Sequence, residues 1–300
     1  MKRPSVVACV MLIGLLAACN PPAGEGAVEA ETISIQNVGS DTIVNLAVRW
    51  AETYQNDHPE IRIVVTGGGS GTGIAGLING TVDIANASRR MKAEEIDAAK
   101  ANGIEPVEYV IARDAIAVVI HPDNPVDQLT LEQISDIFSG RITNWAGVGG
   151  EDRPIVLLSR ESNSGTHVYF LEQVVRLGDK EATTLFSPDT LLMPSSEGIS
   201  AEIRQNPNAI GYDGLGYVTE DQKTVAVIAD PHGQCAEIVE LCQPSVETVN
   251  RGTYPISRDL YMYTAGEPQG AVAQYLAWIR SPEGQVIVGE LGFVPLTSEY

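Results

Sequence analysis

Four times along this chain a short apolar run leads into a loop rich in glycine and hydroxyl side chains, and the loop leads into a segment with helical spacing of apolar residues. A short apolar run bounded by turn residues is typical of a buried strand, and apolar residues three or four positions apart are typical of a helix. Repeated strand–loop–helix units predict an α/β fold. Ligands of such folds bind beyond the carboxyl ends of the strands, so the four loops are the expected place of a site.

The fourth loop, between the apolar run Ile155–Leu158 and a helix predicted from about Val168, has the strongest signal. A helix start carries unpaired amide groups and about half a positive charge. Beside this one lie a guanidinium, several hydroxyls and a glycine amide, namely Arg160, Ser162, Ser164, Gly165 and Thr166. Such a set of donors predicts an anion site. The alternative is that Ser162 or Asn163 only caps the helix and that Arg160 is solvated.

The other three loops have the same character. The first brings Ser40, Asp41 and Thr42 to the start of a predicted helix, and the second, Thr66–Gly73, holds Ser70 among five glycines that would let backbone amides approach a ligand. The third loop follows a strand predicted over Thr81–Ala85 and contains Ser88 and Arg89. Helix capping, a flexible loop or a solvated arginine explains each loop alone. The anion-site prediction therefore depends on all four loops converging.

Two nucleotide-binding motifs are excluded at the second loop. Gly71, Gly73 and Gly76 match the GxGxxG pattern of dinucleotide-binding folds, but the helix that follows would last fewer than three turns before Gly80. A phosphate-binding P-loop is excluded because the sequence contains no Gly-Lys-Ser or Gly-Lys-Thr.

The N-terminal segment has the features of an export signal. Lys2 and Arg3 precede an uncharged apolar run, Val6–Ala18, which is too short to span a bilayer and suits a signal peptide. Residues 16–19, Leu-Ala-Ala-Cys, resemble a bacterial lipobox, which implies cleavage after residue 18 and lipidation of Cys19. An unlipidated secretory signal is the alternative. Residues 19–31 are rich in Pro, Gly, Ala and Glu and are predicted to form a flexible tether.

Two cysteines remain in the predicted mature chain. Cys235 and Cys242 lie seven residues apart in a stretch flanked by Gly and Pro, and in an exported protein this spacing favours a disulfide that closes a surface loop. A metal site is the rival, but His232 is the only histidine nearby. No metal is expected, because the four histidines show no ligand spacing.

The composition is acidic. The chain has 19 Lys and Arg against 39 Asp and Glu, a formal net charge of −20. Removal of residues 1–18 takes away Lys2 and Arg3 and no acidic residue, which makes the net charge −22. Such a chain is a poor partner for nucleic acid or for an acidic membrane surface. An anionic ligand gains no long-range attraction, so local donors must hold it.

A repeated pattern divides the mature chain. Ile111-x-Arg113-Asp114 lies between two apolar runs, and Ile256-x-Arg258-Asp259 repeats it near the C-terminus. We interpret both as strands that cross between two lobes, although coincidence is the alternative. The first lobe would then consist of residues 32–112 and 255–300, and the second of residues 113–254.

In this order the motifs resemble the phosphate-binding proteins of bacterial high-affinity phosphate ABC transporters. The marks are Gly-Ser-Asp-Thr at 39–42, Gly-Ser-Gly-Thr-Gly at 69–73, Thr-Val-Asp-Ile-Ala at 81–85 running to Ser88, the segment 138–145, and Arg160-x-x-x-Ser164-Gly165-Thr166. The resemblance implies a type II periplasmic-binding-protein fold with two α/β lobes and two crossing strands. It also implies a buried anion and delivery of that anion to a membrane permease.

The resemblance assigns ligand contacts by position. From the first lobe these are Ser40, Asp41, Thr42, Ser70, Ser88 and Arg89, and from the second lobe Arg160, Ser162, Ser164, Gly165 and Thr166. Some members of the family have an aspartate directly after the third-loop serine, which accepts the proton of hydrogen phosphate, but this chain has Arg89 there. Asp41 is then the candidate acceptor. A carboxylate would favour hydrogen phosphate over sulfate, which has no proton to donate.

The predicted function is thus a monomeric, membrane-anchored receptor for inorganic phosphate that uses no cofactor. An enzyme is disfavoured because the sequence lacks a Gly-x-Ser-x-Gly elbow and a metal-ligand cluster. Two rival hypotheses stay open: a receptor for another tetrahedral oxyanion, and a phosphate-sensing or surface interaction protein with the same fold.

Overall fold

The structure is a computed structural model that describes residues 32–230 and 238–296. These residues belong to one compact unit that starts at Thr32. The predicted signal peptide, the tether and Cys19 lie outside the described residues, as does Cys235. Within the described ranges, no helix combines the length and the apolar character that crossing a bilayer requires.

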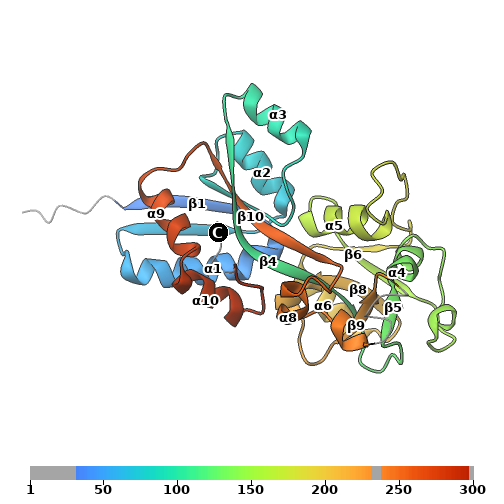
Figure 1. Ribbon diagram of the computed structural model, residues 1–300. Coiled ribbons are helices and arrows are strands. Elements are labelled where there is room, and N and C mark those ends of the chain that lie inside the picture. The colour runs from blue at the N-terminus through green and yellow to red at the C-terminus, as the bar shows by residue number, and fades with distance from the viewer. Residues whose placement is uncertain (1–31, 231–237, 297–300) are drawn as a thin grey trace, which may run out of the picture. The chain divides into compact units, whose positions relative to one another are not determined.

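One sheet runs through the described part of the chain, in the order β2-β1-β3-β10-β4-β8-β6-β7 (Figure 1). On one side three strands lie parallel: β1 (Ile33–Gly39), β2 (Ile61–Thr66) and β3 (Ile84–Ala87). On the other side β6 pairs in parallel with its two neighbours, the strands being β6 (Val156–Arg160), β7 (Leu191–Met193) and β8 (Ala209–Gly214). Two further strands, β5 (Gln128–Thr130) and β9 (Lys223–Ile228), pair with each other, and β9 also pairs with β4.

Two long antiparallel strands connect the two sides of the sheet. The first half of β4 (Pro106–Ile120) pairs with β10 (Ser257–Ala265), and its second half pairs with β8 and β9. The two apolar runs around Arg113 and Asp114 are thus one continuous strand. The repeated Arg-Asp patterns are neighbours on adjacent strands, because Arg258 is the register partner of Asp114 and Asp259 that of Arg113.

Helices follow most of the strands, as the alternating pattern predicts. With the β1–β3 side belong α1 (Asp41–Asp57), α2 (Ser70–Ile78), α3 (Ala93–Ala101), α9 (Gly270–Ile279) and α10 (Pro282–Glu290). With the other side belong α4 (Leu131–Phe138), α5 (Gly165–Phe170), α6 (Ser196–Gln205) and α8 (Val246–Asn250). The helix α5 continues as a π-helical turn, Leu171–Val175. Short 3₁₀ turns occur at Trp145–Val148, Leu215–Tyr217 and Val239–Cys242.

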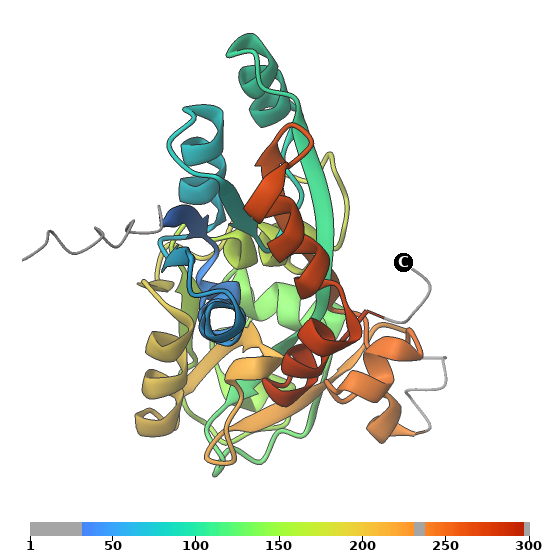
Figure 2. The same cartoon turned by 90° about the vertical axis from the view of Figure 1, so that its left-hand side faces the viewer.

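Two of the clusters that buried apolar side chains form in the described part of the chain are much larger than the others. The first contains Trp50 of α1 and Tyr275 of α9, and the second contains Trp145 and Phe170. Figure 2 shows α1 end-on in blue beside the red helices α9 and α10, where Trp50 Nε1 donates to the carbonyl oxygen of Gly284 at 2.8 Å. β4 contributes to both clusters, since Ile111 and Ala112 belong to the first and Ala115 and Ile116 to the second.

One predicted strand is shifted. The structure begins β3 at Ile84, whereas the apolar pattern predicted Thr81–Ala85. Thr81 instead closes the end of α2, because its amide and its hydroxyl both donate to the carbonyl oxygen of Gly76. Asp83 accepts from the Gln36 amide at 2.7 Å, which attaches this connection to β1.

Candidate ligand-binding site

Three helices begin where strands of the sheet end. α1 follows β1, α2 follows β2 and α5 follows β6, with Ser40, Gly69 and Ser164 as the N-cap residues. Ser164 caps its helix by accepting from the Thr166 amide at 3.2 Å, whereas neither α1 nor α2 has a side-chain cap. Amides in the first turn of a helix have no intrahelical acceptor, so the starts of α1 and α2 bring backbone donors to the edge of the sheet, where the Gly71 amide of α2 already donates to the Asn163 carbonyl oxygen.

Hydroxyl groups from distant loops meet at this edge. Thr42 Oγ1 and Thr166 Oγ1 lie 2.7 Å apart, although 124 residues separate them in sequence. Ser70 Oγ lies 3.2 Å from Ser88 Oγ and accepts from the Ser88 amide at 3.0 Å. All four side chains are fully or almost fully buried. The hydroxyls of the first three loops and the fourth loop therefore occupy one buried region.

Two glycines permit this close approach. A side chain at Gly165 would place its Cβ 2.3 Å from Ser70 Oγ and 2.6 Å from Ser88 Oγ. Gly39 has φ +146°, and a Cβ there would lie 2.2 Å from the carbonyl oxygen of Asn86. Because real Cβ atoms do not reach such distances, only glycine lets the fourth loop contact Ser70 and Ser88, and the end of β1 contact Asn86, as they do.

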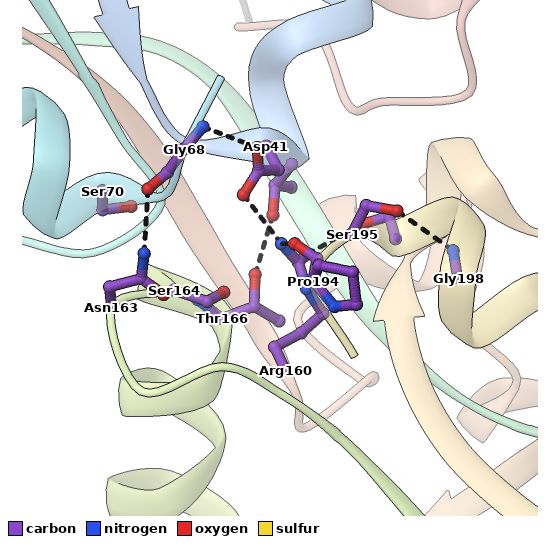
Figure 3. Close-up of polar contacts among 12 residues, drawn as sticks. Asp41, Gly68, Ser70, Arg160, Asn163, Ser164, Thr166, Pro194, Ser195 and Gly198 are labelled. Carbon is purple, nitrogen blue, oxygen red and sulfur yellow. Dashed lines mark hydrogen bonds and ion pairs between the residues drawn. The ribbon is translucent and has the colours of Figure 1, made fainter. Parts of the chain in front are cut away.

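Arg160 joins the fourth loop to the first. Its Nη2 donates to Asp41 Oδ2 at 2.8 Å and to the carbonyl oxygen of Pro194 at 3.1 Å, and its Nη1 donates to Ser196 Oγ at 3.0 Å. Figure 3 shows the guanidinium beside Asp41, whose Oδ1 also accepts from the Gly68 amide at 2.8 Å. The Arg160 side chain is 1% exposed, and its Nε has no hydrogen-bond partner within the described part of the chain.

The second loop also contacts the fourth. Asn163 Nδ2 donates to the carbonyl oxygen of Gly68 at 3.0 Å (Figure 3). The Asn163 carbonyl oxygen accepts from the Gly71 amide at 3.1 Å. These bonds join α2 to the start of α5 beside the buried hydroxyls. The loops are therefore closed on one another in this structure.

Arg258 of β10 reaches the same region, although it lies outside all four loop motifs and was not predicted to belong to the site. Its Nη2 donates to Thr166 Oγ1 at 2.9 Å, and its Nη1 donates to the carbonyl oxygen of Ser88 at 2.9 Å. The same Nη2 lies 2.9 Å from Asp114 Oδ2, and both side chains of this ion pair are at most 2% exposed. The sequence does contain a signal for Arg258, since an Arg-Asp pair lies in the middle of each of the two apolar strands. A charged residue that is buried in a strand needs a partner of opposite charge.

A third carboxyl group lies near Arg160. Burial raises the pKa of Asp213 to about 7, although its neighbours Ser196 and Arg160 oppose the increase. Asp213 Oδ1 accepts from the Gly214 amide at 2.9 Å, and its Oδ2 has no partner among the residues described. This side chain is thus a titrating group next to Arg160 near neutral pH.

The structure brings together most of the residues predicted for the site. The group with mutual contacts in this region comprises Asp41, Thr42, Ser70, Ser88, Arg160, Ser164, Gly165 and Thr166. Ser40 is buried beside them, and its amide donates to the carbonyl oxygen of Asn86 at 2.9 Å.

Two predicted ligand residues lie differently. Arg89 donates from Nη1 and Nη2 to the two carboxylate oxygens of Glu95, both at 2.7 Å, so its guanidinium faces α3 and is neutralised there. Ser162 is exposed, and its side chain makes no hydrogen bond to another described residue. The position of Arg89 depends on a helix that the motif does not include.

Outside the loops, Cys242 is buried and disulfide-bonded, while its expected partner Cys235 lies beyond the described residues. Across those residues, no cluster of three or more His, Cys, Asp or Glu side chains is arranged to hold a metal ion.

Comparison with known proteins identifies the family. A model of the PBP superfamily domain matches residues 25–283. The phosphate-binding protein PstS of Pseudomonas aeruginosa is 35% identical over 283 residues, which cover 89% of this chain and 84% of that protein. PstS of Bacillus subtilis is 30% identical over 260 residues, which cover 86% and 79%. The chain belongs to the PstS family of the PBP superfamily.

A solved structure of the same family supports the fold. A Clostridium perfringens protein, described as a phosphate ABC transporter substrate-binding protein and solved with bound phosphate, superposes with a TM-score of 0.76 at 31% identity and covers 88% of this chain and 100% of its own. The α/β fold predicted from the alternating units and from the resemblance is therefore confirmed. As a member of the PstS family the chain is a solute-binding protein.

Proposed function

We propose that this PstS-family chain captures inorganic phosphate, as hydrogen phosphate, among the four loops. The observation that supports this most is the contact of Thr42 and Ser70 with Thr166 and Gly165, which gathers hydroxyls and helix-start amides from opposite sides of the sheet. Hydroxyls, amides and a guanidinium are the donors that a tetrahedral oxyanion accepts from. The residues proposed to bind phosphate are those that the resemblance assigns, except Ser162, which is exposed. Arg89 stays in this set, although its guanidinium is paired with Glu95.

The energetics of the site are compatible with tight binding. Hydrogen bonds to a charged group contribute about 1.5–3 kcal/mol each. Six or more of them, after ordering and desolvation costs, are sufficient for micromolar or tighter binding, about 8 kcal/mol. The strongly acidic composition does not prevent this, because the donors act at contact distance.

Asp41 is proposed to have two roles. Its carboxylate orients Arg160 and accepts from the Gly68 amide, and these contacts occupy one lone pair on each oxygen. A carboxylate oxygen has a second lone pair. Asp41 is therefore still able to accept the proton of hydrogen phosphate and so to disfavour sulfate.

The remaining predictions extend this proposal. The two apolar clusters are proposed to be the cores of two lobes, residues 32–112 with 255–300 and residues 113–254, that close on the ligand around β4 and β10. The chain is further proposed to act as a monomer without catalysis, to deliver phosphate to an ABC permease, and to be held at a bacterial membrane by a lipid on Cys19. A disulfide between Cys235 and Cys242 is part of the same proposal.

Calorimetry with a panel of oxyanions tests the function. With residues 1–19 removed, we expect micromolar or tighter binding of phosphate at neutral pH and at least tenfold weaker binding of sulfate. Equal or tighter sulfate binding would favour a receptor for another oxyanion. No binding of phosphate, arsenate or sulfate would favour a surface interaction protein with the same fold. Metabolic labelling with palmitate, lost in Cys19→Ser, tests the anchor separately.

A further inference from the structure

A pocket of about 550 Å³ lies next to the candidate site, which is the size of pockets that hold small ligands. Its lining comes from both sides of the sheet: the start of α3, the middle of α5 and the strand β10. Figure 1 shows the places of two helices that contribute residues to this lining, α3 and α5. We call it the basic pocket, because five of its twelve lining residues are basic, Arg89, Arg90, Lys92, Lys180 and Arg258, and only Glu172 and Asp259 are acidic.

The charges of the basic pocket are unequally compensated. Arg89 is paired with Glu95, and Arg258 is paired with Asp114. Arg90 lies 3.6 Å from Glu108 and is 69% exposed, so water screens that contact. Lys92 and Lys180 are exposed and have no ion pair with another described residue. Three exposed cationic side chains thus surround this pocket on a chain with a net charge of −20.

The basic pocket and the candidate site share a wall. Arg258 lines the pocket, and the same guanidinium donates to Thr166 Oγ1 and to the carbonyl oxygen of Ser88. Arg89 also lines the pocket and directly follows Ser88, and its buried Nε has no partner within the described ranges. An anion in this pocket is therefore separated from the loops that are proposed to bind phosphate by only a single layer of side chains.

Because the chain is strongly acidic, such a pocket would affect how fast an anion associates with it. A phosphate dianion that approaches a chain with this charge is repelled, and the repulsion is screened beyond about 8 Å at physiological ionic strength. Inside that distance, a concave surface lined by one sign of charge concentrates the field and raises the rate of association. We propose that the basic pocket is a weak, first anion-binding site that captures hydrogen phosphate before the loops close on it. This inference rests on the proposed function and adds a separate step to it.

Stopped-flow kinetics on the chain lacking residues 1–19 tests the proposal. An environment-sensitive dye on Glu197→Cys would report closure, because Glu197 Oε1 accepts from Asn45 Nδ2 across the two sides of the sheet. In the triple variant Arg90→Gln, Lys92→Gln, Lys180→Gln we expect the association rate constant for inorganic phosphate to fall about tenfold at low salt. The dissociation rate constant should stay within about twofold, since none of the three residues belongs to the set proposed to bind phosphate and the Arg90 side chain contacts Tyr261 and Glu108.

A matched control removes the same charge elsewhere. The triple variant Arg49→Gln, Arg62→Gln, Arg280→Gln also neutralises three exposed basic residues, none of which lines the basic pocket. Its association rate constant should remain close to that of the unchanged protein. The double variant Lys92→Gln, Lys180→Gln leaves the Arg90 contacts intact and should show a smaller decrease in the same direction.

The results separate this inference from the proposed function. An association rate that falls only in the basic-pocket variants, and only at low salt, supports capture in the pocket. An unchanged rate, an equal decrease in the control triple, or a change confined to dissociation overturns it while leaving phosphate binding in place. If the unchanged protein binds no phosphate, the proposed function and this inference both fail.

Discussion

Two arginine–aspartate pairs meet at the candidate site, and they differ in the exposure of the carboxylate. The Arg160 and Arg258 side chains are 1% and 2% exposed. Asp114 is 0% exposed and lies opposite Arg258 on the adjacent strand, whereas Asp41 is 16% exposed and begins α1, 119 residues from Arg160 at the end of β6. One pair is made by strand register, and the other by the approach of a strand end to a helix start.

The difference separates stability from ligand binding. A fully buried carboxylate that loses its partner cannot be solvated, so the loss lowers the stability of the folded protein. A carboxylate at the edge of the loops can turn toward water, so the loss of its partner affects mainly how the loops close. We therefore expect the Arg258–Asp114 pair to act chiefly on stability and the Arg160–Asp41 pair chiefly on affinity.

The largest effect is expected from Arg258→Met. The substitution replaces the guanidinium by an apolar side chain of similar length and leaves Asp114 buried without a cation, which should lower the free energy of unfolding by about 3–5 kcal/mol. Urea unfolding in the absence of phosphate measures it. The double variant Arg258→Met, Asp114→Leu should recover much of the loss. A loss below about 1 kcal/mol in the single variant would contradict the contrast between the pairs.

Asp213 sharpens the comparison because one member of each pair, Arg160 and Asp114, acts on its charge. Its pKa of about 7 exceeds that of an unfolded aspartate, about 3.9, so the folded protein holds a proton between these values that the unfolded chain has released. Stability from this group is therefore present below pH 4 and lost as the pH rises through 7.

In Asp213→Asn that loss should be absent. Relative to the unchanged protein, the variant should gain on the order of 3 kcal/mol between pH 4 and pH 8. Paired urea denaturation curves at both pH values measure the gain, and other titrating groups cancel in the difference. A stability difference that is independent of pH would show that Asp213 does not titrate in this range.

The smallest effect is expected from Asp41→Asn. Its effect on anion affinity distinguishes the two roles proposed for this residue. If Asp41 accepts the proton of hydrogen phosphate, the ratio of phosphate to sulfate affinity should fall about tenfold, because one charge-assisted bond is lost for phosphate alone. If Asp41 only orients Arg160, both affinities should fall together. Competitive calorimetry distinguishes the outcomes, and Arg160→Gln, which should weaken both anions, is the matched control.

Much of the site followed from local features of the sequence. Ser40, Ser70 and Thr166 stand at helix starts that the spacing of apolar residues predicted, and a helix start presents donors whatever surrounds it. The α/β order of the elements followed in the same way. The third strand was misplaced because Thr81, which has a strand-forming side chain, instead closes the end of α2.

The partners of the charged side chains did not follow from local features. Arg89 is predicted to contact the ligand but pairs with Glu95. Asp41 is predicted to accept from the ligand, and the sequence does not show that it also pairs with Arg160. For Arg258 the sequence predicts only a place in a crossing strand, not its bond to Thr166. Nothing within a few residues of a charge specifies which opposite charge will lie beside it.

The sequence alone thus determined which residues place hydrogen-bond donors at helix starts and which strands lead into those helices, because helix starts and strand ends depend on nearby residues. The tertiary structure decided which charges are neutralised and which stay available to an anion. Strand register put Arg258 beside Asp114, and the approach of a strand end to a distant helix start put Arg160 beside Asp41. Both depend on contacts between residues more than a hundred positions apart.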